Sequence, residues 1–481
     1  MFVLRRVLLS SLLALAVAGP SKAEPTWQER VEGWLTSLND RQTGFDLTLD
    51  GLSVGPGDRR ESEASFEAAR LSLDDGGALS VGPGGFRVTA LPDDLLGFDR
   101  VRLPSPAALQ ANPSGVALSL AFDLQSLTGT WDEARSLLRD LDLAAADLAL
   151  TGKAIGEAAA LNRIDLALTT TPTAAGRFDQ TLDLVGQGLT LRPPEGRIRM
   201  DRLVLRGKSL GSDPDALEAW SERLQAAESG QARSPLPPIG SLSRESLGSI
   251  LLAGLQAWSE TDEPLFWLEE LRMESTFSRG ELPNSLTFGL LFEGAGLDLS
   301  ESQDPDLVQA AGLVPRAWSL PVVFEGVPGE ALADLLLDLA AGGSLQQAPV
   351  IDPERKVDFQ PFLRALGAAG TRILVEELTV AGPAGSLSGG ADLTLAPRLP
   401  HGVFGEATFT LGGIEAVGEA LRQIDDPDAA GVAFLITTVI KGLGQPEVGP
   451  DGEIVYRYDL KMGRDGTTLL NGLPLDALLD R

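Results

Sequence analysis

The chain of 481 residues contains no cysteine and a single histidine, His401. Without cysteine the protein cannot form disulfides, use a thiol as a nucleophile or hold a metal through thiolates. It also lacks the residue to which bacterial lipoproteins attach their lipid. One histidine leaves few ways to activate a serine or threonine nucleophile, because histidine is the usual general base. The surrounding sequence, from Leu399 to Gly402, places His401 in a loop between strands.

Motifs for catalysis, metal binding and phosphate binding are also missing. The string nearest to a serine-nucleophile elbow, Gly385–Gly389, has Leu387 at the nucleophile position. Acidic pairs such as Asp74-Asp75 and Asp93-Asp94 do not have the spacing of a calcium-binding loop and are typical of turns. We therefore predict no catalytic, cofactor-binding or metal-binding residues. A hydrolase that uses two carboxylates remains the least favoured function.

Basic residues are scarce relative to acidic ones. The chain has 39 lysines and arginines against 68 aspartates and glutamates, a formal net charge of −29. Such a charge repels nucleic acid phosphates and anionic lipid surfaces, so we expect neither as an electrostatic partner. An acidic excess of this size is typical of highly soluble or salt-tolerant proteins. The alternative is that the acidic surface captures a basic partner.

The N-terminus has the pattern of a cleavable signal peptide. Arg5-Arg6 precedes an apolar run over Val7–Gly19, and small residues at Ser21 and Ala23 form the cleavage site. Both this run and the later apolar segment 429–440 are shorter than the ~20 residues that span a bilayer. We expect cleavage after Ala23, a periplasmic location and no stable membrane insertion afterwards. An uncleaved anchor is the alternative, and 429–440 is expected to be a buried helix.

Apolar periodicity predicts one leading helix followed by many strands. Trp27, Val31 and Leu35 recur at helical spacing over Thr26–Leu38. Alternation with a period of two then occurs repeatedly, and short intervals between the runs leave no room for crossover helices. This favours antiparallel meanders, and we predict a mainly β (α+β) fold. The clearest alternating runs are 116–124, 164–168, 182–184, 286–292, 373–375, 378–380, 393–395, 409–411 and 454–462.

Peripheral amphipathic helices and two β-rich units complete the predicted organisation. A helix is expected after Ser212-Asp213-Pro214 and another over Ser243–Trp258. Later helices are expected at 306–312, 330–341, 359–366 and 414–423. The expected parts are a signal peptide over 1–23, an N-terminal unit over 24–205, a helical, proline-rich connector over 206–265, and a C-terminal unit over 266–481. Asp465-Gly466 and Asn471-Gly472 are expected to form two-residue hairpin turns.

The stretch from Thr371 to Leu475 carries a family resemblance. The order of its short motifs resembles that of an exported bacterial envelope family, "domain of unknown function 2125". These motifs are Ala381-Gly382-Pro383, the strand Ala391–Leu395, Pro400–Gly405, Gly412-Gly413 and the closing Asp465–Leu475. More distantly the chain resembles the YdgA-type and AsmA-like β-groove proteins. The AsmA-like resemblance implies a long curved sheet whose apolar inner face holds acyl chains. AsmA-like proteins usually keep a membrane anchor, and this chain departs from them if its signal is removed.

These observations favour a non-catalytic envelope protein that binds a hydrophobic, lipid-like ligand or assists lipid traffic. An envelope scaffold that binds other proteins and no small ligand is the alternative. Strands with one apolar face must bury that face against a second sheet, helices or lipid. If a groove remains open, the two cleanest alternating runs should line it: Val116, Leu118, Leu120, Phe122, Leu286, Phe288, Leu290 and Phe292.

Overall fold

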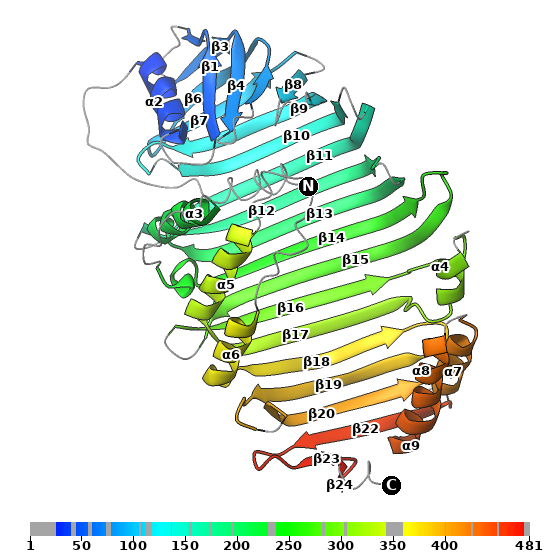
Figure 1. The fold of residues 1–481 in the computed structure, drawn as a ribbon. Helices are drawn as coiled ribbons and strands as arrows, with labels where there is room; N and C mark the ends of the chain where they lie inside the picture. Colours follow the sequence, from blue (N-terminus) through cyan, green and yellow to red (C-terminus); the bar gives the residue numbers. More distant parts are fainter. Residues whose placement is uncertain are drawn as a thin grey trace. The chain divides into compact units, whose positions relative to one another are not determined.

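The structure is a computed structural model that describes most of the chain (Figure 1). The expected signal peptide, its cleavage site at Ala23 and the candidate groove residue Val116 lie outside the described residues. The described residues are 26–39, 45–55, 60–73, 78–104, 107–111, 118–135, 137–152, 156–173, 176–193, 196–228, 237–280, 284–302, 305–342, 359–399, 401–424, 427–449 and 452–475.

The fold is mainly β, as predicted, with 60% strand and 19% helix and large antiparallel sheets. The chain divides into two compact units. Unit 1 comprises the described residues within 1–193, 202–246 and 337–356, and unit 2 those within 194–201, 247–336 and 357–481. Among the described residues, no helix is both long and apolar enough to cross a membrane.

Unit 1 is built around the long strand β9. β10 pairs with β9 along one edge, while β8 and β7 share the other edge. Strands β6, β3 and β2 continue outward from β7, and β5, β4 and β1 continue from β8. The elements are α2 (Trp27–Asn39), β1 (Phe45–Asp50), β2 (Ser53–Val54), β3 (Glu61–Phe66), β4 (Ala68–Leu73), β5 (Ala78–Val81), β6 (Gly84–Leu91), β7 (Leu95–Arg102), β8 (Ala107–Ala111), β9 (Leu118–Asp132), β10 (Leu137–Gly152), β11 (Gly156–Pro172) and β12 (Phe178–Leu191).

A closed hydrophobic core fills the N-terminal part of unit 1. Val31 and Leu35, one turn apart on α2, are buried against side chains from β3, β6, β7 and β9. Trp34 stacks on Phe98 with ring centroids 5.4 Å apart, and Trp131 is 1% exposed. The leading helix predicted from sequence therefore covers the start of the sheet (Figure 1).

Unit 2 contains an antiparallel meander in which each strand from β15 to β20 pairs with the next, and β22 pairs with β20. Its strands are β15 (Pro264–Arg279), β16 (Ser285–Ala295), β17 (Ala317–Pro328), β18 (Arg372–Ala381), β19 (Ser386–Leu395), β20 (Val403–Gly412), β21 (Gln445–Val448), β22 (Ile454–Met462), β23 (Thr468–Leu470) and β24 (Leu473–Pro474). Its helices are α4 (Pro305–Ala310), α6 (Gln360–Ala369), α7 (Ile414–Arg422), α8 (Pro427–Phe434), the π-helix η4 (Leu435–Ile440) and α9 (Lys441–Leu443). Helix α5 (Gly329–Gly342) contributes residues to both units.

The helix expected over Ser243–Trp258 is wrong, because this segment is the strand β14 (Glu245–Trp258). Its residues Leu247, Ile250 and Leu251 have a helical spacing within the strand, and Gly254, at φ +64°, interrupts the alternation further along. The connector expected over 206–265 is consequently mostly strand. It contributes the end of β13 (Arg197–Ser212), β14, the start of β15, α3 (Pro214–Glu228) and the short 3₁₀ helix η3 (Ile239–Ser241). The predicted cap of α3 is confirmed, since the Asp213 carboxylate accepts a hydrogen bond from the Ala216 amide at 3.2 Å.

Two turns were predicted near the C-terminus, and one has the expected geometry. Asn471 and Gly472 have φ of +51° and +79°, and Leu470 pairs with Leu473, as a two-residue hairpin requires. The chain also reverses at Asp465-Gly466, but through a longer loop. There Met462 pairs with Thr468, and the Asp465 carboxylate accepts the Thr467 amide at 3.0 Å, which stabilises the wider turn.

Candidate functional site

The strand register of unit 2 gathers apolar side chains on one side of the sheet. Phe277, Phe288, Phe324, Ile373 and Leu393 lie directly opposite one another on five consecutive strands. Residues that alternate with them in each strand extend the same side. We call this surface the apolar face; it comprises Leu271, Met273, Phe277, Leu286, Phe288, Leu290, Phe292, Trp318, Leu320, Val322, Phe324, Ile373, Val375, Leu378, Val380, Leu387, Ala391, Leu393, Ala407, Phe409, Leu411, Tyr456, Tyr458, Leu460 and Met462.

Irregularities in the strands keep these residues in phase. In β18 the register shifts between Val375 and Leu378, so both sequence runs point to the same face although they have opposite parity. The pairing of β18 with β17 shows the same extra residue, because the four steps from Ser319 to Val323 in β17 face the five steps from Leu374 to Thr379 in β18. Without this bulge, half of β18 would turn its apolar residues to the other side.

The middle of the apolar face is open. Leu290 is 43% exposed, Phe292 41% and Leu320 38%, although all three are large apolar side chains in paired strands. Phe292 and Trp318 pack together with ring centroids 5.8 Å apart, without covering the surface. By contrast Leu286, on the same side of β16, is 1% exposed. The face is therefore closed near one end of β16 and accessible toward the other.

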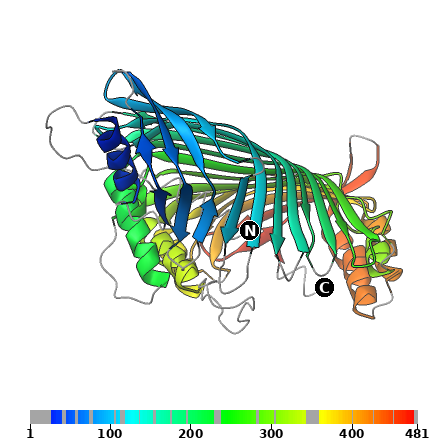
Figure 2. The same cartoon turned by 90° about the horizontal axis from the view of Figure 1, so that it is seen from above.

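Helices border the apolar face. The side chains of Ile436 and Ile440 in η4, with Ile414 of α7, pack on Tyr456 and Tyr458. Helix α6 packs against β17 and β19. Figure 2 shows α6 and the α7–α9 group on the same side of the unit 2 sheet, at opposite ends of its strands. The open part of the face consequently lies between two helical borders.

The opposite side of the same sheet is polar. The Arg372 guanidinium bridges three strands, contacting Glu325 at 3.0 Å and both carboxylate oxygens of Asp392 at 2.7 Å. These hydrogen bonds lower the pKa of Asp392 below its usual value and raise that of Arg372. Further ion pairs on this side are Arg272–Glu274, Arg272–Glu293, Arg457–Asp459 and Lys461–Glu406. The sheet of unit 2 is thus amphipathic, and its polar side suits contact with solvent.

Unit 1 has a comparable apolar side on β9–β12. Leu120 lies opposite Leu150, and Phe122 lies opposite Ala107; the side chains of Leu120 and Phe122 are both partly exposed. The register places Leu118 opposite Gly152. Toward the other end of these strands the surface is covered, since Leu168, Leu182 and Leu184 are buried.

The predicted groove residues thus fall into two sets, one in each unit. Leu118, Leu120 and Phe122 belong to β9 of unit 1. Leu286, Phe288, Leu290 and Phe292 belong to β16 of unit 2, where they share the apolar face, but Leu286 is buried beneath other side chains. Sequence reasoning did not find the residues of β15 and β17 that continue this face. Their signal was weaker because Ser275 interrupts the alternation in β15, and because Pro321 and Val323 on the other side of β17 are not polar.

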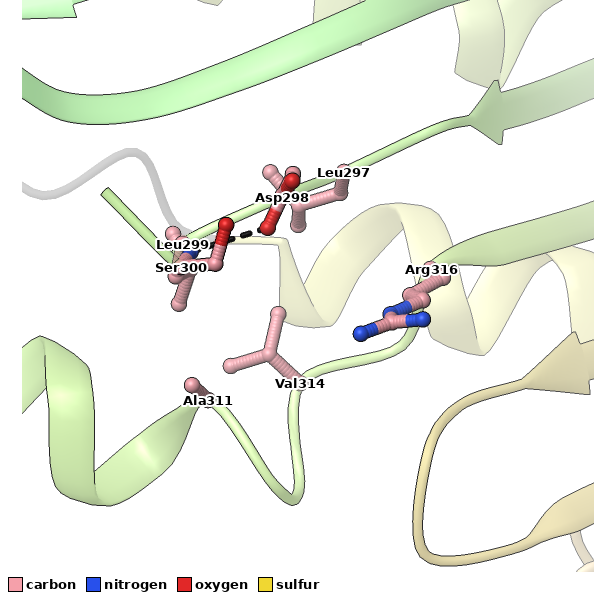
Figure 3. Close-up of a pocket in the computed structure, with 7 residues that line it drawn as sticks. All are labelled: Leu297, Asp298, Leu299, Ser300, Ala311, Val314 and Arg316. Carbon is pink, nitrogen blue, oxygen red and sulfur yellow. Dashed lines mark hydrogen bonds between the residues drawn. The ribbon is translucent and has the colours of Figure 1, made fainter. Parts of the chain in front are cut away.

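A small cavity lies where the chain leads from β16 through α4 to β17 (Figure 3). The Asp298 carboxylate accepts the Ser300 amide at 2.8 Å, and this hydrogen bond lowers the pKa of Asp298. The cavity has a volume of about 50 Å³, whereas ligand sites usually hold ~300–1,000 Å³. Its lining residues are Leu297, Asp298, Leu299, Ser300, Ala311, Val314 and Arg316.

His401 is exposed in the loop between β19 and β20, as the sequence predicted. Within the described ranges, no three histidine, aspartate or glutamate residues are placed to hold a metal ion. Comparisons of the chain with protein-family models, with curated proteins and with solved structures found no match.

Proposed function

We propose that this chain is a non-catalytic periplasmic protein that binds lipid acyl chains on the apolar face of unit 2 and assists lipid traffic in the envelope. The observation that carries the proposal is the open middle of that face, around Leu290, Phe292 and Leu320. Each Å² of apolar surface removed from water contributes about 25 cal/mol, so an acyl chain laid on this surface would be held by the hydrophobic effect. The periplasmic location is inferred from the N-terminal sequence pattern.

The dimensions of the face suit an acyl chain. From β15 to β22 the paired strands lie about 4.8 Å apart, which gives a surface about 29 Å across the meander. An acyl chain spans half of a hydrocarbon core that is ~30 Å thick. One chain lying across the strands would therefore fit between the two ends of the meander. Among the paired residues on this side, the one charged residue is Arg279, which lies opposite the buried Leu286; the open part around Leu290 is uncharged, which suits a neutral hydrocarbon tail.

A pair of matched variants tests this proposal. Leu290 and Leu291 are neighbours in β16 on opposite sides of the sheet, and asparagine has nearly the shape of leucine. Leu290→Asn removes apolar contact and places an amide against the ligand, an effect of about 2 kcal/mol, or more than tenfold in affinity. Leu291→Asn should leave affinity unchanged. The measurement is titration of delipidated protein with a fluorescent fatty acid.

Two results would decide against lipid binding on the apolar face. Absence of fatty acid binding by the parent protein would leave the apolar face to a protein partner, which is the scaffold function. If the Leu290→Asn, Leu291→Asn and parent proteins bind fatty acid with equal affinity, the fatty acid binds to another surface. Circular dichroism of each variant checks that the strands are retained.

A further inference from the structure

A second apolar surface lies on the C-terminal helices, away from the open middle of the sheet. Val432 is 44% exposed, Phe434 63%, Leu435 48% and Val439 39%. We call these four residues the helix patch. The sequence predicted that 429–440 would be a buried helix, and that prediction is wrong: among residues 431–440, whose side chains the structure describes, only Ala433 is fully buried.

The helix that carries the patch is firmly held on its other side. Ile436 and Ile440 pack into the cluster around Tyr458, whose hydroxyl donates a hydrogen bond to the Ile440 carbonyl oxygen at 2.9 Å. Helix α7 approaches so closely that a Cβ at Gly418 would overlap Thr437. Lys441 pairs with Glu415 at the end of the segment. The helix therefore cannot readily turn to bury its exposed residues.

The size and charge of the patch indicate its partner. A stable protein interface covers about 800 Å² and ~20–30 residues on each side, far more than four side chains on one short helical segment. A bilayer requires only an apolar helix face that enters the boundary between headgroups and acyl chains. No charged residue occurs in 429–440, and the net charge of −29 disfavours anionic lipid surfaces.

We propose that the helix patch docks the protein on the surface of a lipid bilayer of low net charge. The helix contacts the β22 end of the apolar face, through Tyr456 and Tyr458, so docking would hold that end of the sheet close to the membrane. This docking goes beyond binding of acyl chains. It stands on a separate set of exposed residues and requires no ligand on the sheet.

The absence of cysteine allows a test with a single label. Phe434→Cys and, as a control, Leu363→Cys on α6 would each carry one environment-sensitive dye; Leu363 is similarly exposed, at 51%, but lies outside the patch. With phosphatidylcholine vesicles, the dye at position 434 should shift to the blue and the dye at 363 should not. Vesicles in which about one third of the lipid is anionic should give a weaker shift, restored by salt.

A second measurement uses unlabelled protein. Leu435→Asn should reduce co-sedimentation with phosphatidylcholine vesicles at least fivefold, while Leu363→Asn should leave it unchanged. Leu435→Asn should also leave fatty acid affinity unchanged, which separates this proposal from ligand binding on the sheet. The proposal is overturned if the parent protein does not bind vesicles or if the dyes respond equally. It also fails if ultracentrifugation shows a dimer that Leu435→Asn dissociates, since the patch would then join two copies.

Discussion

Two leucines in β16 offer a direct test of whether the apolar face is open. Leu286 and Leu290 are the same residue type on the same side of the same strand, but they are 1% and 43% exposed. Truncation to alanine removes equal numbers of atoms at both positions. Any difference in the free energy of unfolding therefore reports how completely each side chain is covered.

The expected costs differ several-fold. Leu286→Ala should lose the transfer free energy of the removed atoms and leave a cavity, at a cost of about 2–5 kcal/mol. Leu290 is only a little more than half covered, and water can fill the space that truncation leaves. Its loss should be about 1 kcal/mol, half of the ~2.4 kcal/mol expected for three buried carbon groups.

The assay is urea unfolding of delipidated protein followed by circular dichroism, with unfolding free energies from linear extrapolation. Delipidation matters because a ligand on the face would stabilise the folded state and make Leu290 appear more important. Adding fatty acid should raise the unfolding midpoint of the parent protein more than that of Leu290→Ala. Equal costs for the two delipidated variants would refute the reasoning, because Leu290 would then be covered by protein.

Substitutions at three further positions test separate features. Arg372→Gln should cost about 0.2–1 kcal/mol at neutral pH. Because Arg372 lowers the pKa of Asp392 in the folded state, the ion pair stabilises the protein above the usual aspartate pKa, and this stabilisation is lost as the pH falls through the lowered pKa. Urea unfolding of the parent and Arg372→Gln proteins at neutral pH and at a pH below the lowered pKa checks this sign. Gly294→Ala should destabilise by about 1–3 kcal/mol in thermal unfolding, because its Cβ would overlap the Trp318 indole; an unchanged midpoint would contradict that contact. Asn471→Ala should lower the free energy of unfolding in urea more than Asn471→Gly does. Both variants lose the side-chain hydrogen bonds, but only glycine accepts a φ of +51° freely. A larger loss for Asn471→Gly would exclude this turn geometry.

Sequence periodicity predicted much of the fold where alternation was unbroken. It located β16 and β22, the leading helix and the cap at Asp213, because each depends on local spacing or local hydrogen bonds. It failed at β14, where Leu247, Ile250 and Leu251 have a helical spacing although they belong to a strand, and where Gly254 breaks the alternation. It also treated 373–375 and 378–380 as separate runs, although a bulge joins them in one strand.

The candidate site was only partly predictable for a different reason. Alternation shows that Leu286 and Leu290 share one side of a strand, but exposure depends on what lies above each residue, which is a property of distant segments. The same limit applies to the helix patch. An uncharged run such as 429–440 predicts burial from composition, yet in the structure Ile436 and Ile440 pack on the sheet while Phe434, Leu435 and Val439 are exposed.

The last long strand of unit 2 has a consequence for self-association. One edge of β22 pairs with β20, and its other edge is divided between β21 and β23, of 4 and 3 residues. Pro446 in β21 has no amide hydrogen to offer an incoming strand, and Glu447 adds a charge. A sheet with an exposed apolar side would otherwise be prone to edge-to-edge stacking into fibres. These short terminal strands hinder the addition of further strands at this edge, so the sheet can keep an exposed apolar face without polymerising there.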